Sequence, residues 1–537
     1  MIDTILYNGN IITLNPLQPR VEAVAITFGR IIALGSDDDV LNLATATTNK
    51  YNLNGKTVIP GLTDAHLHFE WISRSLATVD LYEVPSRQEA INRIATFTEV
   101  HPDQEWILGR GWAQDLWKDD DNFPTATDID PVTGNRPAYF SAKSGHAGWA
   151  NSAALRAAGI TSDTPDPDGG QILRDADGNP TGALLETAME LVVNALPEPT
   201  TDQLADQMKV AHDQMLSVGL TGFHDYDEPS SMAALQVLRE RGDLSMRVVK
   251  QVKQEWLDHA IESGLRWNFG DDWIRIGAVK TFADGALGPR TAYMFEPYVG
   301  EPDNYGMTVV DKEEMQHIVS RASAAGLPST IHAIGDRAVH DVLDVYEQVR
   351  KEEAARGETP DQRRHRIEHV QIIHPDDKGR LAELGVIASM QPIHATSDWD
   401  RAERFWGEER IKWAYNARLQ LDLGAVVAFG SDAPVEPFRP FEGIYSAVAR
   451  RQPNGSPSPE GWLPELKVTV DEALRGYTTG AAYAAGMEDR LGQLAYGYYA
   501  DLLVIDRDPY KADGDELLYT KVLATMVNGV IRYGGLD

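Results

Sequence analysis

The 537-residue sequence contains no cysteine. Disulfides, thiolate metal ligands and a cysteine nucleophile are therefore excluded. No apolar run approaches the roughly 20 residues that a membrane-spanning helix needs, and the N-terminal residues lack the basic and apolar segments of a signal peptide. The G-x-S-x-G motif of many serine hydrolases is also missing. From these absences we expect a soluble, cytoplasmic protein that does not use a serine elbow or a thiol.

Basic residues are scarce relative to acidic ones. The chain has 49 Lys and Arg against 81 Asp and Glu, which gives a formal net charge of −32 at pH 7. Such a charge repels nucleic-acid phosphates and anionic membrane surfaces, so neither is an expected partner. With 42% hydrophobic residues, the length predicts two or three domains with a large core. We expect a small-molecule substrate, with a homodimer as the assembly to test.

The segment from Pro60 to His68 carries the strongest chemical signal. An apolar run, Thr57-Val58-Ile59, leads into it and indicates a buried strand that ends at Pro60-Gly61. His66 and His68 are two residues apart, so on an extended chain they project to the same side, beside the carboxylate of Asp64. Two neutral imidazoles next to a carboxylate suit a divalent metal. Two surface histidines in a loop are the alternative, which this Pro-Gly-x-x-Asp context disfavours.

Both ends of the chain consist of short strand-like runs separated by hairpin signals. Asn8-Gly9, Gly29-Arg30 and Asn528-Gly529 stand between runs rich in Ile, Val and Leu. Neither end has enough strands to bury a face alone. We therefore predict one β-sandwich built from residues 1–57 and 490–537.

Between these ends, strand-like and helix-like segments alternate. This rhythm predicts a parallel sheet and, with about eight units, a (β/α)8 TIM barrel that starts in residues 58–75 and continues through residues 201–489. After the first histidine pair, the expected barrel strands are Thr221–Asp225, Ile274–Lys280, Ser329–His332, His365–His369, Val386–Met390 and Val426–Gly430. Polar residues fall at the C-terminal ends of these strands, the face on which barrel enzymes carry their chemistry.

Residues 76–200 break the rhythm and are rich in Asp, Pro, Gly and Trp. An uninterrupted loop of that length inside a domain is usually functional, so we predict an insertion subdomain that acts as a lid over the barrel mouth. Trp112 and His146 are expected to face the substrate, whereas Trp117 is expected in a small core of the insertion. Residues Arg110–Gln114 lack the third glycine of a dinucleotide-binding fingerprint.

The ordered strand-end residues resemble the amidohydrolase superfamily, most closely its amidohydrolase-3 branch, the YtcJ-like and N-substituted formamide deformylase group. These residues are His66 with His68, Lys280, His332, His369 and Asp432. The supporting segments are Val279–Gly285, His332–Asp336, Arg366–His369 and Gly430–Pro434, and in the insertion Ser144–Ala147, Asn151–Leu155 and Thr181–Leu184.

The resemblance implies an active site with two divalent ions, zinc first among them, and attack by a hydroxide that the ions hold. His66, His68, Lys280 and Asp432 are expected to bind one ion, and Lys280, His332 and His369 the other. A protonated lysine has no lone pair, so Lys280 is expected to be carboxylated to a carbamate; the alternative is an ammonium paired with Asp284. Asp432 is the expected proton shuttle and His224 the expected hydrogen-bond donor to the oxyanion.

The expected substrate is a small or medium neutral amide, an N-substituted formamide or an N-acyl amine. His394 is expected beside the substrate, as are the insertion residues. Arg290 either binds a substrate carboxylate, which favours an N-acyl amino acid, or pairs with Asp284. The alternatives are a deaminase, a cyclic amide or lactone hydrolase, and a binding protein on this scaffold. Glu368 directly precedes His369, so we expect it on the opposite face of the strand, which disfavours a deaminase.

The sequence His365-Arg366-Ile367-Glu368-His369 also matches the H-x-x-E-H protease motif. That motif needs a helix to bring both histidines to one face. The following Val370-Gln371-Ile372-Ile373 indicates a strand, on which His365 lies about 13 Å from His369. We therefore reject the protease interpretation.

Overall fold

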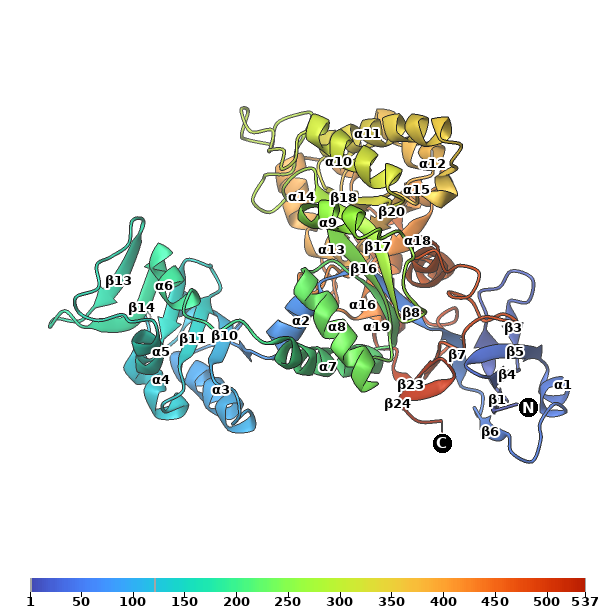
Figure 1. Ribbon diagram of the computed structural model, residues 1–537, viewed down its shortest axis with the longest axis horizontal. Helices are drawn as coiled ribbons and strands as arrows, with labels where there is room; N and C mark the ends of the chain where they lie inside the picture. Colours follow the sequence, from blue (N-terminus) through green and yellow to red (C-terminus); the bar gives the residue numbers. More distant parts are fainter. Residues whose placement is uncertain (1, 120–121, 537) are drawn as a thin grey trace. The chain divides into compact units, whose positions relative to one another are not determined.

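The computed structural model describes residues 2–119 and 122–536. It divides the chain into two compact units (Figure 1). The barrel unit comprises Met1–Trp71 and Met208–Asp537, and the insertion unit comprises Ile72–Gln207. The insertion predicted over residues 76–200 lies within the second unit. Its predicted role as a lid stays a prediction.

The barrel unit contains the predicted (β/α)8 barrel. Its eight strands form one sheet of parallel neighbours in the order β21-β20-β19-β18-β17-β16-β15-β8. They are β8 (Leu62–Leu67), β15 (Leu220–Asp225), β16 (Arg247–Lys253), β17 (Ile274–Phe282), β18 (Ser329–Ala333), β19 (Arg366–His369), β20 (Ile387–Met390) and β21 (Val427–Phe429). A parallel bridge between Leu67 and Ala433 joins the last strand region to the first and closes the barrel.

Helices follow most strands and cover the outside of the sheet (Figure 1). They are α8 (Pro229–Arg241), α9 (Leu257–Glu262), α10 (Lys312–Ala324), α11 (Asp336–Ala355), α12 (Arg380–Leu384), α13 (Pro392–Ser397), α14 (Trp399–Trp406), α15 (Ala417–Asp422), α16 (Pro440–Ala449), α17 (Val470–Arg475) and α18 (Ala481–Ala484). The strand β16 was not predicted from sequence. Its buried run from Arg247 to Gln251 contains two charged residues, which weakens the apolar pattern of an interior strand.

The two chain ends build the predicted β-sandwich. One sheet has β5 (Arg30–Gly35), β4 (Ala23–Thr27), β1 (Thr4–Tyr7) and β6 (Asn49–Asn52), with α1 (Asp37–Leu41) beside it. The other has β24 (Val530–Gly534), β23 (Val522–Val527), β22 (Leu502–Ile505), β7 (Thr57–Pro60), β2 (Asn10–Ile12) and β3 (Arg20–Val21). Buried side chains of both sheets, such as Leu6 and Val504, share one core.

The strand β7 differs from the sequence-based boundary. We placed residue 58 at the start of the barrel, but Val58 pairs with Val504 of the sandwich sheet. The barrel begins only at Leu62, after Gly61. A Cβ at Gly61 would lie 2.3 Å from the Thr221 hydroxyl, so glycine permits the chain to pass from sandwich to barrel at this point.

The insertion unit is a mixed sheet with helices. Its strands, in sheet order, are β13 (Gly170–Arg174), β14 (Pro180–Glu186), β12 (Ala147–Ala150), β11 (Ala138–Ala142), β10 (Ile107–Trp112) and β9 (Val79–Asp80). Its helices are α3 (Arg87–Val100), α4 (Ala126–Thr133), α5 (Ser152–Ala157) and α6 (Glu190–Val193), while α2 (Phe69–Leu76) and α7 (Thr201–Ser217) span the two boundaries of the unit. Trp112, Trp117 and Trp149 all lie in its core.

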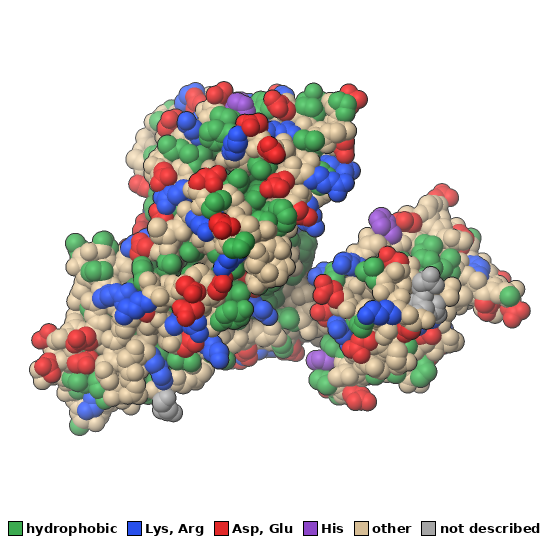
Figure 2. Space-filling model, turned by 180° about the vertical axis from the view of Figure 1, so that it is seen from behind, with side chains coloured by type: hydrophobic (Ala, Val, Ile, Leu, Met, Phe, Trp, Pro, Cys, Tyr) green, Lys and Arg blue, Asp and Glu red, His purple; other side chains and the backbone are tan. Residues whose placement is uncertain are grey.

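The surface carries many charged side chains of both signs. On the face shown in Figure 2, Asp and Glu are interspersed with Lys and Arg, in keeping with the excess of 81 acidic over 49 basic residues. None of the described helices has an apolar stretch long enough to cross a bilayer.

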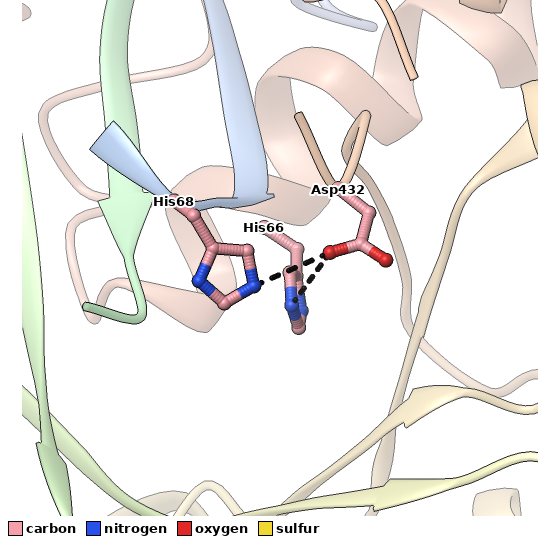
Figure 3. A group of neighbouring side chains, drawn as sticks. All are labelled: His66, His68 and Asp432. Carbon is pink, nitrogen blue, oxygen red and sulfur yellow. Dashed lines mark ion pairs between the residues drawn. The ribbon is translucent and has the colours of Figure 1, made fainter. Parts of the chain in front are cut away.

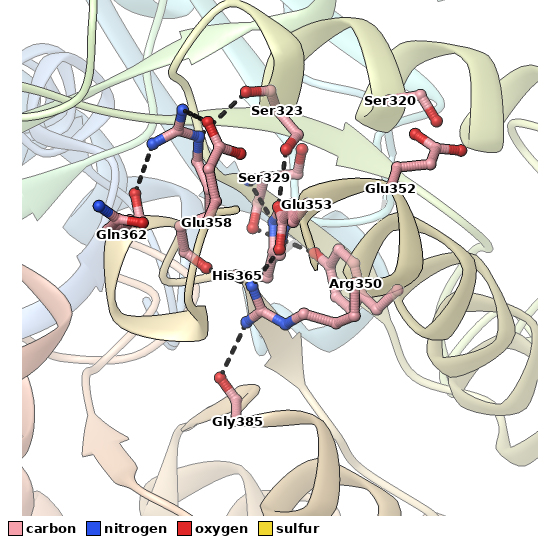
Figure 4. A network of polar contacts seen from close by, with 12 residues as sticks. Ser320, Ser323, Ser329, Arg350, Glu352, Glu353, Glu358, Gln362, His365 and Gly385 are labelled. Carbon is pink, nitrogen blue, oxygen red and sulfur yellow. Dashed lines mark hydrogen bonds and ion pairs between the residues drawn. The ribbon is translucent and has the colours of Figure 1, made fainter. Parts of the chain in front are cut away.

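The rejected protease motif has a structural role at the start of β19. His365 is fully buried, its Nδ1 accepts a hydrogen bond from the Ser329 amide at 3.0 Å, and its Nε2 donates to Glu353 at 2.9 Å. Glu353 also receives hydrogen bonds from Ser323 and Arg350 (Figure 4). This network ties α10 and α11 to the N-terminal ends of β18 and β19.

Replacing Glu353 with alanine should therefore destabilise the barrel. The substitution leaves the buried His365 without the acceptor of its Nε2 proton and removes the carboxylate paired with Arg350, and the free energy of unfolding should fall by about 3 kcal/mol. Chemical denaturation measures it. Glu347→Ala, an exposed position on the same helix, is the control and should change little. Equal effects of the two substitutions would contradict the assignment.

Candidate metal centre

Three side chains converge at the C-terminal end of the barrel. His66 comes from β8, His68 follows it, and Asp432 follows β21 (Figure 3). The Nε2 atoms of both histidines lie 3.4 Å from the same oxygen, Asp432 Oδ1. One potential ligand atom from each residue lies within 4.8 Å of the other two, which is close enough for all three to bind a single ion.

The backbone around Asp432 places this carboxylate. Its N–H donates to the carbonyl of His66 at 2.7 Å, and its φ of 60° lies in the left-handed region. Asp64 supports the same junction, because its Oδ1 accepts the amides of His66 and Ser431 at 3.1 and 3.0 Å. The carboxylate that we expected beside the metal is therefore a backbone anchor. Burial raises the pKa of Asp64 to about 7.

His66 is held by a buried carboxylate behind it. Its Nδ1 lies 2.6 Å from Glu368 Oε2, and neither side chain is more than 1% exposed. The carboxylate accepts the Nδ1 proton, which leaves the Nε2 lone pair facing Asp432. Burial lowers the pKa of His66 to about 4, so the ring is neutral and able to bind a metal at pH 7.

His68 has an equivalent support. Its Nδ1 lies 3.1 Å from Asp227 Oδ1, which directs Nε2 toward Asp432. Burial alone would lower the pKa of His68, but the hydrogen bonds to Asp227 and Asp432 outweigh it and raise the pKa to about 9. A bound cation would compete with that proton for the same Nε2 lone pair.

His369 and His332 form the neighbouring part of the site. His369 Nδ1 pairs with Gln391 Oε1 at 2.8 Å, which leaves Nε2 as its metal-binding atom. His332 has the opposite tautomer, because its Nε2 donates to the Gly285 carbonyl at 2.9 Å and leaves Nδ1 free. Burial holds the pKa of both rings below the ordinary range, that of His332 at about 3. Their ring centroids are 4.6 Å apart.

Lys280 lies in the barrel interior at the C-terminal end of β17. It is 2% exposed, and its Nζ lies 4.9 Å from the Tyr226 ring centroid and 4.6 Å from that of Phe282. Burial lowers the pKa of Lys280 to about 8. The expected alternative partner, Asp284, is engaged elsewhere: it accepts the amides of Tyr293, Ile334 and Gly335.

These donor atoms fit a divalent metal. Four imidazoles each have one nitrogen fixed by a hydrogen bond, which leaves the other as the candidate metal ligand, and a carboxylate completes the set. On His68 that second nitrogen carries the proton that a metal would displace. Fixed tautomers of this kind are characteristic of metal-ligating histidines. The clusters within ligand distance among the described residues include His66 with His68 and Asp432, and His369 with His394 and Asp432.

The structure corrects the expectation for His224. Its Nδ1 accepts a hydrogen bond from Arg366 at 2.8 Å, and it lines a cavity of about 20 Å³ together with Gly61 and Thr221 from the N-terminal ends of β8 and β15. His224 therefore faces the bottom of the barrel and not the mouth. Tyr226, two residues later and directly after β15, lies at the metal centre, with its ring stacked 3.8 Å from the His66 ring.

The expectation that Glu368 faces away from the site is also wrong. Glu368 points into the barrel toward His66, and His369 approaches the same region with its ring 5.0 Å from that of His66. Both residues reach the interior because the backbone leaves the extended conformation at His369, where φ is 77°. Glu368 is paired with Arg366 at 2.9 Å and fully buried, so it is not a free general base.

Two further candidates lie in the barrel unit. His394, in α13, has its Nε2 buried without a hydrogen bond, 3.8 Å from Asp432 Oδ2, and its Nδ1 lies 3.3 Å from the Gln371 amide. The expected position of His394 beside the reaction centre agrees with this geometry. Arg290 is 3.0 Å from Glu301. Arg290 thus pairs with Glu301 and not with Asp284. This ion pair neutralises the cation that we expected to bind a substrate carboxylate.

The two candidates in the insertion unit have different environments. Trp112 is fully buried, and its Nε1 donates to the Phe140 carbonyl at 2.8 Å. Packing within the insertion core thus accounts for Trp112, as it does for Trp117. His146 is largely exposed and pairs with Glu186 at 3.0 Å.

Glu368, Asp227 and Gln391 hold the ligands but were not predicted as site residues. Each lies within two residues of a barrel strand end, and Asp227 follows β15 directly after Tyr226. Strand-end position was therefore the available signal. It could not distinguish side chains that support a ligand from those that face solvent.

Comparisons with known proteins agree with this geometry. Residues 50–533 match the Amidohydrolase family profile. The chain is 32% identical to the putative amidohydrolase YtcJ of Bacillus subtilis, with 98% of this chain and 99% of the relative covered. It is also 32% identical to the N-substituted formamide deformylase of Arthrobacter pascens, with 99% and 98% covered.

A solved structure has the same fold. An uncharacterized metal-dependent hydrolase from Pyrococcus furiosus superposes with a TM-score of 0.78 and 31% sequence identity, and the match covers 95% of this chain and all of that one.

Removing the carboxylate behind His68 should weaken metal binding. We expect Asp227→Asn to lower metal affinity about 10- to 100-fold, because the ring loses the charged acceptor that orients it. Competition with a chromophoric chelator measures this without any substrate.

Asp213→Asn is the matched control for that experiment. Asp213 also lies 3.1 Å from a buried histidine, His212, but outside the metal centre. Its metal affinity should equal that of the unmodified protein. Retention of full affinity in Asp227→Asn would refute the supporting role.

Proposed function

We propose that this chain, which belongs to the amidohydrolase family and is a metal-dependent hydrolase of carbon–nitrogen bonds, cleaves a small neutral amide. The proposed substrate class is an N-substituted formamide or an N-acyl amine. The observation that carries the proposal is the convergence of His66, His68 and Asp432, with each histidine oriented by a buried carboxylate.

The proposed cofactor is zinc, with two ions per chain. His66, His68 and Asp432 would hold one, and His332 and His369 the other. When bound, such ions act as Lewis acids and lower the pKa of water toward about 7. His66, His332 and His369 each present one nitrogen that their hydrogen bonds leave free, and His68 directs its Nε2 toward Asp432, which supports this ligand assignment.

Lys280 is the proposed bridge between the two ligand sets. Burial holds its pKa at about 8, so an appreciable fraction of the amine is unprotonated near neutral pH and able to combine with carbon dioxide. The resulting carbamate turns a buried cation into an anion with two oxygens. Within the part of the chain that the structure describes, no carboxylate forms a direct ion pair with the Lys280 ammonium, which contacts the Tyr226 and Phe282 rings.

Asp432 and His394 are the proposed residues of proton transfer and carbonyl polarisation. Asp432 would accept the proton of the attacking water and deliver it to the leaving nitrogen, since its carboxylate lies 3.4 Å from His66 Nε2 and 3.8 Å from His394 Nε2. With the Gln371 amide donating to His394 Nδ1, the proton of His394 lies on Nε2, from which it can donate to the carbonyl oxygen of the substrate. His394 thus takes the role that we first expected for His224.

A neutral substrate agrees with the charges at the barrel mouth. Arg290 is neutralised by Glu301, and an uncompensated carboxylate would be costly to bury beside Asp432. The name of the Arthrobacter relative, an N-substituted formamide deformylase, supports the same substrate class. In such a substrate, the acyl group is a formyl group and the variable substituent is on the nitrogen.

The direct test compares N-benzylformamide with N-acetylphenylalanine, using protein whose metal content has been measured. We expect about two metals per chain, cleavage of the formamide, loss of activity with a chelator, and a fall in turnover of about 10² or more in Asp432→Asn. Arg290→Ala should leave formamide cleavage nearly unchanged. Preference for the amino acid that disappears in Arg290→Ala would overturn the neutral-amide proposal.

Lys280→Ala should be inactive and bind less metal, because the bridging carbamate is lost. Short carboxylic acids such as acetate or propionate should restore part of the activity by supplying two oxygens in its place. Activity is measured against acid concentration, with Lys253→Ala, a partly exposed lysine paired with Glu228, as the control. Full activity of Lys280→Ala without added acid would exclude the carbamate.

A further inference from the structure

The open side of the metal centre is marked by two exposed aromatic rings. Among the residues that the structure describes, the exposed aromatic side chains in contact with a ligand histidine are Trp71 and Phe282, with 54% and 38% of their surface accessible. Exposed aromatic rings also occur elsewhere on the barrel unit, for example Trp256 and Phe269, so exposure alone does not distinguish Trp71 and Phe282. What distinguishes them is their contact with the ligand histidines.

Trp71 lies in the first turn of α2, directly after the histidine pair. Its ring stacks on His68 with centroids 4.8 Å apart and an angle of 23° between the planes. Because His68 is fixed by Asp227 on its other edge, the indole is held in a defined orientation. One face of Trp71 covers the ligand, and much of the rest is open to solvent.

Phe282 is the last residue of β17 and belongs to the other ligand group. Its centroid is 5.2 Å from that of His332, and the Lys280 Nζ lies 4.6 Å from its ring. The strand positions Phe282 as rigidly as it positions Lys280, two residues earlier. Trp71 thus lies beside the ligand group that contains His68, and Phe282 lies beside the group that contains His332.

The part of the centre formed by His369 and His394 is buried. His369 and His394 are 5% exposed each and line a cavity of about 20 Å³, room for about one water molecule. A large acyl group does not fit into a cavity of this volume. An amide whose carbonyl is bound by His394 would therefore have its acyl group on the buried side and its nitrogen substituent toward the exposed rings.

We infer that Trp71 and Phe282 form the specificity surface of this enzyme and select an aromatic or long alkyl substituent on the amide nitrogen. This inference rests on the proposed function. Stacking or apolar contact with the two rings would contribute through buried area and ring geometry. A methyl substituent is too short to reach both rings, so the selection acts on substituent size and leaves the reacting amide untouched.

The experiment compares N-benzylformamide with N-methylformamide in the zinc-loaded protein and its Trp71→Ala and Phe282→Ala variants. We expect each substitution to lower kcat/KM for the benzyl substrate about tenfold or more, mainly through KM, and to change that for the methyl substrate less than threefold. Inhibition by benzylamine should weaken in parallel, whereas inhibition by methylamine should not.

Matched controls are Trp256→Ala and Phe269→Ala, which remove aromatic rings that are 44% and 64% exposed elsewhere on the barrel unit. Both should leave the benzyl-to-methyl ratio unchanged. Metal content measured in every variant separates loss of selectivity from loss of the site.

Equal losses for the benzyl and methyl substrates in Trp71→Ala and Phe282→Ala would overturn the inference and leave the proposed function standing. If the unmodified protein cleaves neither formamide, an N-substituted formamide as the substrate of the proposed function is excluded. The amine-binding comparison then decides the inference alone: tighter benzylamine binding that depends on both rings supports it, and equal binding of the two amines refutes it.

Discussion

The buried carboxylate of Glu368 is the interaction on which the metal centre depends. It accepts the Nδ1 proton of His66 and is itself neutralised by Arg366 at 2.9 Å, with all three side chains at most 2% exposed. A charge at this depth persists only when it is paired and hydrogen-bonded. Arg366 meets that need and also donates to the Ala65 carbonyl and to Ser389, so one guanidinium connects β8, β19 and β20. The same network therefore fixes a ligand tautomer and holds barrel strands together.

The barrel divides its polar interior into two levels with different tasks. At the N-terminal end, His365 and Glu353 tie strands to helices and never approach the mouth. At the C-terminal end, His66 and His68 each direct Nε2 to within 3.4 Å of Asp432 Oδ1, so each of the three residues offers one ligand atom at the same place. A histidine whose two nitrogens are both satisfied stabilises the fold, whereas one with a free lone pair in a buried site is available for a metal. Hydrogen-bond accounting thus separates structural from functional histidines where burial alone cannot.

The sequence predicted the elements whose chemistry follows from local pattern. The His-x-His pair, the βα alternation and the strand-end positions of Lys280 and Asp432 needed only periodicity and spacing. Glu368 was placed on the wrong face because strict alternation assumes an extended chain, and His369 departs from it with a φ of 77°. His224 was placed too close to the mouth because a strand shows which way a side chain points but not how deep it lies. That depth depends on strand tilt and on partners such as Arg366, which come from remote sequence.

The difference in exposure across the metal centre links the fold to substrate choice. A barrel places its ligands at strand ends, but it does not determine which side of the ligand cluster stays open. Here the loops after β19 and β20 bury His369 and His394, while the turn after β8 and the end of β17 leave Trp71 and Phe282 accessible. In the proposed orientation, an amide would meet little space at its acyl end and two aromatic rings at its nitrogen end. Reaction chemistry thus comes from the strand ends, and substrate selection from the residues immediately beyond them, so specificity can change without disturbing the metal ligands.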